Sequence, residues 1–469
     1  MNSIEEVKAE LNGDAGKWEE AIFHWACDIA QSKAKQFLEE TDEELMRERQ
    51  EELQVVGFRE RCITTTFGDV KVQRRLYKDR DKNPRFLLDE HVGLEGGSRA
   101  SPRVKELATF VCSYLPFRPS EQLLCAVLPQ GISHTTIHRL VGKVVDPHIA
   151  REEEEVRELF EDGVVPDSEE RVVPYLMTEA DGTSIALQRE KEKRTEVKVG
   201  IAYEGWEMES KDHYRLTGKM SYTGIMKGQR FWEGMSLNLA KKYDLPMIDK
   251  VIVGSDGAHW AKQGADILKG DFQLDRFHLR RALLQELKGD VDLANSVYQA
   301  CARGEVALAD SLLATAQDSA QVEDRKEIAS LRGYLMDNAE GLADYRIGVS
   351  HDGLRGMGAI EGNVDKLVAT RMKKRGMSWT KRGGDRMSRL INLRESGEIQ
   401  SWIREAPHKI NSPLRKSSEA RTQTKHLPAG ADDGAWLEVS MPCLHGPHLN
   451  RPWAQVLRQL SHQTHGRRQ

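Results

Sequence analysis

Apolar and polar residues follow a helical spacing through most of the first 165 residues of the chain. One exception is residues 64–77, where β-branched and polar residues alternate on both sides of Gly68-Asp69. This alternation predicts two strands joined by a Gly-Asp turn, and therefore a small β hairpin after an acidic helical stretch. Ser101-Pro102 then supplies an N-cap and a first-turn proline, which predict the start of a helix.

Two further short helices are predicted on either side of Gly131. The first begins at Pro119 and the second is capped by Ser133, and two short helices about a glycine turn have the spacing of a helix-turn-helix. In such a motif the start of the second helix faces DNA, and the candidate contacts are His134, Thr135, His138 and Arg139. An ordinary helical hairpin has the same spacing, so both interpretations stay open. A separate charged helix is expected over residues 152–161.

Beyond about residue 172 the pattern becomes that of an α/β protein. The order β-β-β-α-β-α-β-α is that of an RNase H-like core. Residues 290–345 are rich in Ala, Leu and Glu without a strand pattern, which predicts an all-helical insertion in this core. The predicted strands are residues 172–182, 195–203, about 214–223, 249–257 and 270–275, and the predicted helices include residues 229–243 and 277–287.

A chain of 469 residues is long enough for two to four domains. We predict four regions. They are an N-terminal helical region with a β hairpin (1–100), a helix-turn-helix domain with a linker (101–165), the RNase H-like core with its insertion (166–400) and a basic C-terminal tail (401–469).

The formal net charge of −5 argues at first against a polyanionic partner, but the charge is unevenly distributed. Acidic residues crowd residues 39–52, which we interpret as a solvated helix face. Residues 366–394 hold ten Lys and Arg against Asp385 alone, a local charge of +9. A solvated surface and a DNA-binding surface are both consistent with that charge. The candidate DNA contacts there are Arg371, Lys373, Lys374, Arg375, Lys381 and Arg382.

Neither a membrane nor an oxidising compartment is indicated by the sequence. No window holds the roughly 18 uninterrupted apolar residues that a membrane span needs, and the first residues lack the basic and apolar parts of a secretory signal. Six cysteines are scattered without a CxxC pair, so a disulfide framework is not expected. We therefore expect a cytoplasmic protein without a membrane partner.

Three acidic residues are the candidates for chemistry. Asp181 and Asp256 each follow an apolar run and precede a glycine, so both are expected at the carboxyl ends of neighbouring strands. Glu361 is expected at the start of a helix that runs into the basic stretch. Carboxylate oxygens are the ligands that Mg²⁺ prefers, and phosphodiester cleavage at neutral pH needs an activated water and a stabilised leaving oxygen. The three acids therefore predict a metal-dependent phosphodiester-cleaving site beside a phosphate-binding surface.

Four short segments in this order resemble a known enzyme family. The segments are Glu179-Ala180-Asp181-Gly182-Thr183, Val253-Gly254-Ser255-Asp256-Gly257-Ala258, Asp275-Arg276-Phe277-His278-Leu279, and Ile360-Glu361-Gly362-Asn363 continuing to Arg375-Gly376-Met377-Ser378-Trp379. The chain resembles the DDE transposases of bacterial insertion sequences, and within them the ISLre-type family, which is related to the Mutator-like clade. The resemblance extends over roughly residues 60–460.

The resemblance implies an enzyme that cleaves and transfers DNA strands at the ends of an insertion sequence. Asp181, Asp256 and Glu361 would be both the catalytic residues and the ligands of two Mg²⁺ ions, with Mn²⁺ as a possible substitute. Asp275 and His278 match an Asp-x-x-His pattern of the related clade and would be auxiliary residues. The implied partners are double-stranded DNA, at the element ends and the target, and further copies of the chain. One departure is the absence of Trp between residues 290 and 345, where some relatives place an aromatic residue.

Three other functions are weighed against this one. A standalone RNase H-like nuclease or junction resolvase would use the same chemistry without needing particular DNA ends. A helix-turn-helix regulator would bind DNA without a divalent ion and would not cleave it. A glycoside hydrolase is disfavoured because that chemistry needs sugar-stacking aromatic residues, and aromatic residues are only 6% of this chain.

Overall fold

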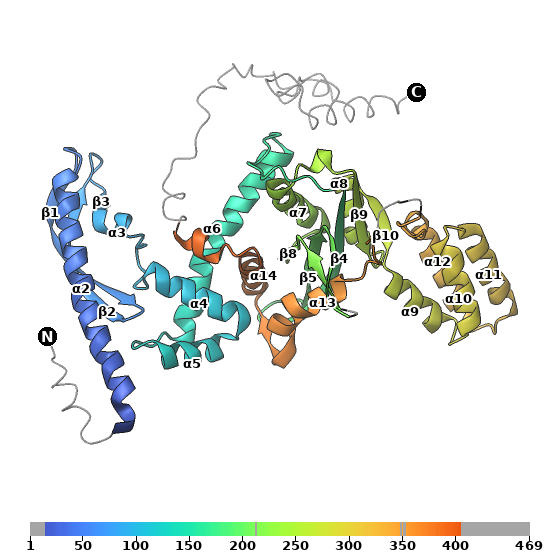
Figure 1. Ribbon diagram of the computed structural model, residues 1–469, viewed down its shortest axis with the longest axis horizontal. Helices are drawn as coiled ribbons and strands as arrows, with labels where there is room; N and C mark the ends of the chain where they lie inside the picture. Colours follow the sequence, from blue (N-terminus) through green and yellow to red (C-terminus); the bar gives the residue numbers. More distant parts are fainter. Residues whose placement is uncertain (1–14, 212, 348, 350–352, 405–469) are drawn as a thin grey trace, which may run out of the picture. The chain divides into compact units, whose positions relative to one another are not determined.

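The computed structural model describes residues 15–404, with gaps at 212, 348 and 350–352 (Figure 1). From residue 405 onward, the predicted basic tail lies outside the described residues. Contacts divide the described chain into two compact units, one of residues 15–148 with 397–404 and one of residues 149–396. The four regions predicted from the sequence stay a prediction. None of the described helices is long and apolar enough to cross a membrane.

The first unit combines a long helix with a small antiparallel sheet. The predicted hairpin is confirmed, because β1 and β2 pair in antiparallel register from Gln54↔Lys78 to Thr65↔Gly68. Its turn is Thr66-Phe67 and not Gly68-Asp69. Gly68 instead opens β2 with a φ of 115°, where a side chain would also strike Gln31 of α2. The elements are η1 (Ala15–Lys17), α2 (Trp18–Glu48), β1 (Gln54–Thr65), β2 (Gly68–Lys78), β3 (Pro84–Arg85), α3 (Leu87–His91), α4 (Pro102–Tyr114), α5 (Phe117–Val127) and the start of α6 (His134–Phe160).

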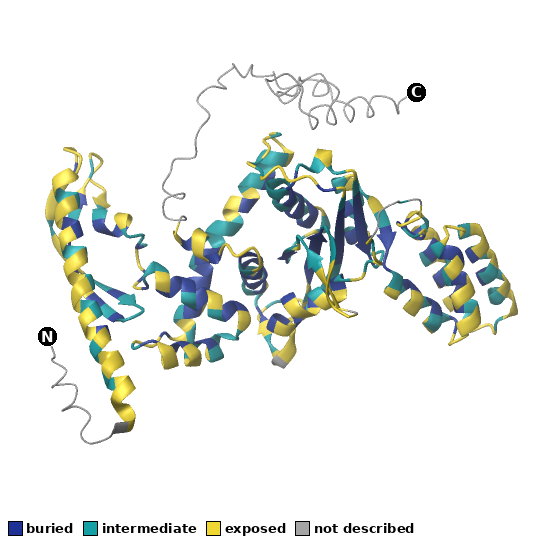
Figure 2. Cartoon of the chain, in the orientation of Figure 1, coloured by how far each residue is buried: buried dark blue, intermediate teal, exposed yellow. Residues whose placement is uncertain are grey.

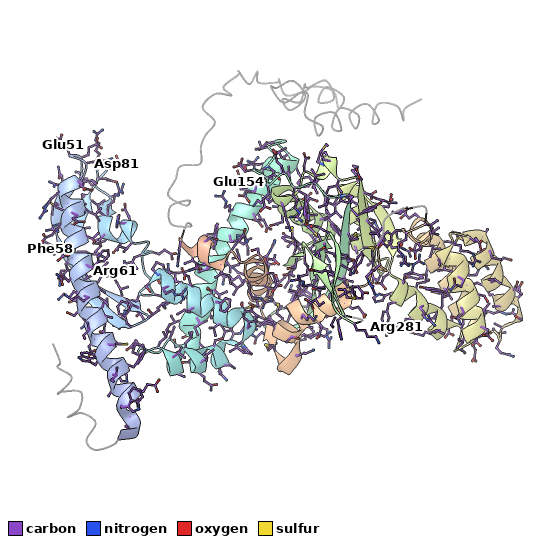
Figure 3. The ribbon with its side chains drawn as sticks, in the orientation of Figure 1. Glu51, Phe58, Arg61, Asp81, Glu154 and Arg281 are labelled. Carbon is purple, nitrogen blue, oxygen red and sulfur yellow. The ribbon has the colours of Figure 1, made fainter. Side chains whose placement is uncertain are left out.

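Buried ion pairs hold α2 and α3 on this sheet. Asp42 is buried in α2 and accepts a hydrogen bond of 2.6 Å from the Arg75 guanidinium, so this one residue of the acidic stretch is not on a solvated face. Arg61, labelled in Figure 3, donates at 2.6 Å to Asp89 of α3. A small apolar core that includes Ile63, Val72 and Leu88 lies alongside these pairs.

The helices α4, α5 and α6 follow the predicted order with one difference in length. The Ser101 hydroxyl accepts a hydrogen bond from the Val104 N–H and so caps α4 as predicted. The short helix predicted after Ser133 is longer than expected, because α6 runs unbroken for 27 residues and includes the charged helix that we expected to be separate. Pro147 lies inside α6 and cannot donate a backbone hydrogen bond, but the helix continues past it to Phe160.

The second unit is built on a mixed sheet with the order β10-β9-β4-β5-β8 (Figure 1). β5 is antiparallel to both β4 and β8, whereas β9 is parallel to β4 and β10 is parallel to β9. The short β11 also pairs with β4. The strands are β4 (Tyr175–Leu187), β5 (Arg194–Tyr203), β6 (Gly205–Ser210), β7 (His213–Thr217), β8 (Met220–Gly224), β9 (Lys250–Ser255), β10 (Asp271–Leu274) and β11 (Ser378–Trp379).

Helices lie on both faces of this sheet, whose strands are buried (Figure 2). On one face, α7 and α8 pack with Leu176, Ala180 and Val253 in a core that includes Phe231 and Trp232. On the other face lie α13, η4 and α14, which contact β4, β5 or β8. The helical elements are α7 (Gly228–Lys242), η2 (Leu245–Met247), α8 (His259–Leu268), α9 (Arg276–Glu286), α13 (Ile360–Val364), the π-helical η4 (Asp365–Lys373), η5 (Lys374–Gly376) and α14 (Lys381–Glu395).

Two of the predicted strands differ from the observed ones. β4 does not end at Asp181-Gly182 but continues to Leu187, because Gly182 keeps its place in the ladder opposite Lys198. The region expected as one strand near residues 214–223 is divided. Residues 213–217 form β7, which pairs with β6 in a separate two-stranded sheet, and only β8 joins the main sheet.

The predicted all-helical insertion is confirmed over the described residues between 290 and 345. It consists of α10 (Val291–Ala302), α11 (Val306–Ser319), α12 (Asp324–Asp337) and η3 (Ala339–Gly341). These helices share an apolar core with Leu279 and Leu283 of α9. The insertion therefore packs on the helix that follows β10, next to the strands that carry the acidic residues.

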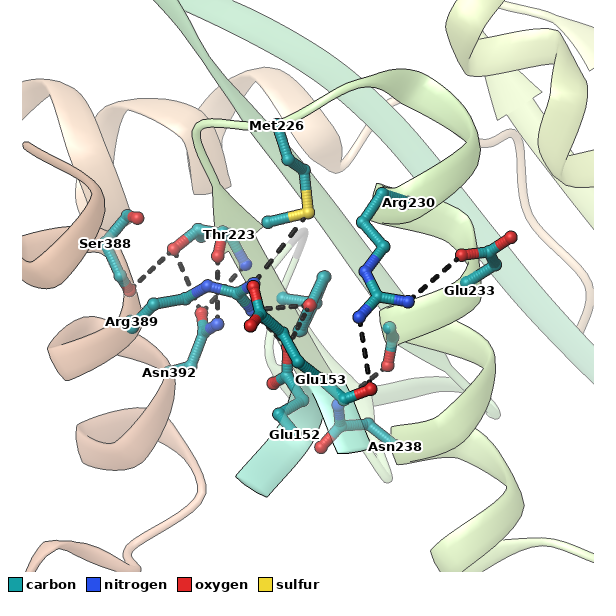
Figure 4. Close-up of polar contacts among 12 residues, drawn as sticks. Glu152, Glu153, Thr223, Met226, Arg230, Glu233, Asn238, Ser388, Arg389 and Asn392 are labelled. Carbon is teal, nitrogen blue, oxygen red and sulfur yellow. Dashed lines mark hydrogen bonds and ion pairs between the residues drawn. The ribbon is translucent and has the colours of Figure 1, made fainter. Parts of the chain in front are cut away.

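A buried polar network joins α6, β8 and α14 within the second unit (Figure 4). The Arg389 guanidinium donates at 2.6 Å to the Glu152 carboxylate, and the Tyr222 hydroxyl donates to the same oxygen at 2.6 Å. Asn392 accepts from the Thr223 N–H at 2.8 Å and donates back to the Thr223 carbonyl at 2.9 Å. α14 is thus fixed to the sheet by hydrogen bonds as well as by apolar packing.

Candidate active site

Asp181 and Asp256 are brought side by side by the pairing of β4 with β9. The parallel register places Ala180 opposite Ser255, so the next residue of each strand is one of the two aspartates. The Asp256 carboxylate accepts a hydrogen bond of 2.9 Å from the Ala258 N–H, which shapes the turn into α8. The proximity predicted from the sequence is confirmed, although Asp181 is in the middle of its strand and not at its end.

Alternation along β4 puts three polar side chains on the face that α13 and η4 cover. Glu179, Asp181 and Thr183 are spaced two residues apart, so they point to the same side of the sheet. Glu179 accepts hydrogen bonds from the backbone that leads into α13, and the Thr183 hydroxyl is 3.4 Å from Nζ of Lys373 at the end of η4. Glu361, the second residue of α13, is thereby carried to the same face as Asp181.

His278 connects Glu361 with Asp275 at the start of α9. Asp275 is the N-cap of α9, and its carboxylate accepts the His278 N–H at 2.9 Å. Nδ1 of the same imidazole lies 3.2 Å from that carboxylate oxygen, while Nε2 lies 3.8 Å from Oε1 of Glu361. The Asp-x-x-His spacing therefore has a structural cause, since the cap and the third helical residue face each other in the first turn.

The charges of these side chains affect one another. Burial, reinforced by repulsion from Asp256 and Glu361, raises the pKa of Asp181, while a hydrogen bond from the Gly182 N–H opposes that rise. The Asp275 carboxylate, 3.2 Å from Nδ1, raises the pKa of His278, and attraction to Asp256 and Asp181 adds to that rise. The site therefore gathers more negative charge than its single histidine can balance, which is typical of a cation-binding site.

The donor set fits a hard divalent cation, since Asp181, Asp256 and Glu361 all offer carboxylate oxygens. Among the described residues, no three His, Cys, Asp or Glu side chains are gathered closely enough to form a complete metal-binding group. The Glu361 side chain is 49% exposed, and its carboxylate lies 3.8 Å from Nε2 of His278.

The basic side chains of residues 366–394 do not form a single surface. Lys373, Lys374 and Lys381 are exposed, and Lys374 is 2.8 Å from Asp365, which lies one residue before the stretch of charge +9. Arg371 is buried with its guanidinium 5.3 Å from the centre of the Trp379 ring, so it packs η4 against β11. Arg389 is also buried, in the network with Glu152. Arg382 is exposed, and the side chain of Arg375 lies outside the described part.

The four residues predicted to face DNA at the start of α6 differ in their surroundings. Nδ1 of His134 is 2.6 Å from a carboxylate oxygen of Glu121 in α5. His138 meets the ring of Phe117, also in α5, edge to face with 5.3 Å between ring centres. Thr135 and Arg139 are exposed, as is His138. The two histidines therefore join α5 to α6, whereas Thr135 and Arg139 lie on the surface of the first unit.

Glu179 is the one residue of this site that the sequence interpretation left out. It is 1% exposed, lies in the same strand as Asp181, and accepts hydrogen bonds from the turn before Glu361. The sequence feature that could have identified Glu179 is its position as the one charged residue between Leu176 and Ala180 in a predicted buried strand. A buried carboxylate needs hydrogen-bonding partners, so its presence there indicates a specific contact.

Fold and site together define a mixed α/β protein with an acidic cluster at the join of two parallel strands. Residues 14–406 match the model of an uncharacterised protein family (UPF0236), and the chain belongs to that family. A UPF0236 protein of Caldanaerobacter subterraneus subsp. tengcongensis is 23% identical over 375 residues, which cover 77% of this chain and 75% of that protein. The "UPF0236 protein in vanSb 3′region" of Streptococcus gallolyticus is 28% identical over 361 residues, which cover 73% of this chain and 74% of that protein.

Proposed function

We propose that this protein is a DNA transposase that cleaves and joins DNA strands at the ends of a mobile element. The observation that carries the proposal is that Asp181, Asp256 and Glu361, from three separate segments, all interact electrostatically with His278. Repulsion among acids is costly unless a cation compensates it, so an arrangement of this kind is more easily explained by function than by stability.

The sheet supports an RNase H-like classification of the core. Three antiparallel strands, β4, β5 and β8, precede two strands that are parallel to β4, with helices between them. This is the element order that the sequence predicts for such a core, and the acids lie at the central pair, β4 and β9. The helical insertion between α9 and α13 agrees with the long interval between the second and third acid of the resembled family.

Asp181, Asp256 and Glu361 would hold the divalent cations, Mg²⁺ or in its place Mn²⁺. Bound there, such ions supply an activated water or 3′-hydroxyl and stabilise the leaving oxygen. The residues of the chain contribute the rest: Asp275 orients the His278 imidazole, and His278 in turn provides a positive charge or a proton donor 3.8 Å from Glu361. No covalent intermediate with the protein is needed.

Two surfaces of the chain would contact DNA. Nζ of Lys373 lies 3.4 Å from the hydroxyl of Thr183, and Thr183 is two residues beyond Asp181 on the same face of β4. Lys373 is therefore suited to bind a phosphate next to the scissile one. Exposed Lys374, Lys381 and Arg382 extend that surface. In the first unit, Thr135 and Arg139 on α6 would read element ends as the second helix of a helix-turn-helix. Arg371 is left out because it is buried.

The names of the relatives add support of a different kind. The name of one Caldanaerobacter relative joins eleven locus labels of a single organism. A product carried at several loci of one genome is what a mobile element leaves behind. Transposition also requires two element ends to be held together, so a homo-oligomer is part of the proposal.

Incubating the purified protein with Mg²⁺ and DNA that carries the sequences flanking its own gene would test the proposal. A transposase binds and nicks the end sequences in preference to shuffled DNA of equal length. Cleavage of branched DNA without preference for the ends would indicate a resolvase instead. Binding without cleavage at any Mg²⁺ or Mn²⁺ concentration would indicate a regulator and refute the proposal.

A further inference from the structure

Glu179 is a fully enclosed carboxylate whose hydrogen-bonding capacity is filled by donors. Oε2 accepts the Gly358 N–H at 2.9 Å and the Ile360 N–H at 3.2 Å. Oε1 accepts the Ala359 N–H at 3.2 Å and the hydroxyl of Tyr203 from β5. Two oxygens with four acceptor positions thus meet four donors.

The donors favour the charged form of this group. Three are backbone N–H groups, which only donate, so a protonated carboxyl would direct its own hydrogen at one of them or lose an acceptor position. Burial raises the pKa of the Glu179 carboxyl, and the hydrogen bonds from Tyr203, Ile360 and Ala359 oppose that rise. The carboxyl also lies at the positive end of the helix formed by α13 and η4, which favours its charged form.

The backbone before Glu361 is shaped to reach Glu179. Gly358 has a φ of 132°, a conformation that residues with a side chain rarely adopt, and this turns consecutive N–H groups toward one carboxylate. Space for the carboxylate comes from Gly254 of β9, opposite Glu179, where an added Cβ would lie 3.3 Å from Cγ of Glu179 and 2.9 Å from Met357. The contact therefore depends on glycines from two other segments.

We propose that Glu179 is a positioning residue that fixes Glu361 relative to Asp181. Asp181 lies two residues beyond Glu179 on the same strand face, and Glu361 immediately follows Ile360, whose N–H Glu179 accepts. The first and third acids of the proposed triad are thus linked by short, hydrogen-bonded backbone. Glu179 would not touch DNA or metal. It would fix the backbone position from which the half-exposed Glu361 side chain extends. This inference rests on the proposed function, because it assigns Glu361 to the metal site.

Glu179→Gln is the informative change because it keeps the shape and reverses part of the hydrogen bonding. The amide NH₂ replaces one of the two accepting oxygens: in place of Oε2 it loses the bonds to Gly358 and Ile360, and in place of Oε1 it loses the bond to Ala359. At least one bond to the turn is therefore lost. The matched control is Thr178→Val, at the neighbouring buried residue of β4, whose hydroxyl donates to the Ile252 carbonyl at 3.2 Å and does not contact the turn. Tyr203→Phe removes one of the four donors and serves as the milder variant.

Backbone hydrogen exchange without metal or DNA gives the first readout. In the wild-type full chain the amides of Gly358, Ala359 and Ile360 should exchange slowly. Glu179→Gln should accelerate at least one of the three at least tenfold, while Thr178→Val leaves all three unchanged. Binding of Mn²⁺ alone, followed by electron paramagnetic resonance, gives the second readout. We expect Glu179→Gln to weaken Mn²⁺ binding about tenfold or more, and Tyr203→Phe to weaken it less.

Activity gives the third readout and separates the two possible failures. At saturating DNA, the single-turnover cleavage rate of Glu179→Gln should fall about 100-fold with little change in DNA affinity, because a misplacement of about 1 Å has that effect. If wild-type protein neither binds Mn²⁺ nor cleaves DNA, the proposed function fails. If wild type does both and Glu179→Gln matches it, the positioning role is refuted. If Glu179→Gln does not fold, Tyr203→Phe decides: unchanged exchange and Mn²⁺ affinity would refute the role.

Discussion

Arg389→Met should destabilise the second unit strongly, although Arg389 belongs to the basic stretch whose charge is consistent with a DNA-binding surface. The guanidinium and Glu152 are both buried, 2.6 Å apart, and Tyr222 shares the same carboxylate oxygen. Removing one partner of a buried pair leaves the other charge uncompensated and costs about 3–5 kcal/mol. In a unit of this size such a loss lowers the melting temperature by about 10 °C.

Scanning calorimetry and urea unfolding of three variants would test this expectation. Lys381→Met is the control for loss of a positive charge, because its side chain is exposed, and it should stay within about 0.5 kcal/mol of wild type. The double variant Glu152→Gln with Arg389→Met removes both charges and should recover a large part of the lost stability. A loss below about 1 kcal/mol for Arg389→Met, or equal losses for Arg389→Met and Lys381→Met, would contradict the structural role of the pair.

Three further predictions concern the DNA surface, a buried thiol and the turn before Glu361. Lys373→Glu with Lys374→Glu should weaken DNA binding and reduce the slope of log affinity against log salt by about two, and an unchanged slope would remove both residues from the DNA surface. Burial raises the pKa of the Cys301 thiol to about 11 from its ordinary 9.0, so the folded chain keeps this proton longer than the unfolded chain. The free energy of unfolding should therefore fall between about pH 9 and pH 11, and Cys301→Ala should flatten that fall in urea titrations; parallel curves would contradict it. Gly358→Ala forces a side chain into a φ of 132° and should slow strand cleavage as Glu179→Gln does, whereas Gly362→Ala, in open space, should not.

Much of the second unit could be predicted because its strands are buried on both sides. Such strands appear in the sequence as short apolar runs, and parallel neighbours meet at one edge, so the proximity of Asp181 and Asp256 followed from the pattern alone. The same logic failed for the end of β4. Asp181-Gly182 has the composition of a turn, but the ladder with β5 continues through Gly182, where an added Cβ would strike Glu196.

The residues that could not be predicted are those whose partners are distant in the sequence. Arg389 pairs with Glu152, 237 residues away, and nothing near either residue distinguishes a buried arginine from an exposed one. Glu179 accepts backbone hydrogens from a turn about 180 residues later. A local charge count therefore overestimates the DNA surface and misses a residue that orders the site.

The most direct test of the central claim is strand cleavage by single variants of the three acids. Asp181→Asn, Asp256→Asn and Glu361→Gln each keep the shape of the side chain and remove one carboxylate. Purified proteins would be compared in Mg²⁺ on DNA with the flanking end sequences, with end binding measured in parallel. The account predicts that each variant loses cleavage and keeps end binding. Full cleavage by any one of them would contradict its place in the site.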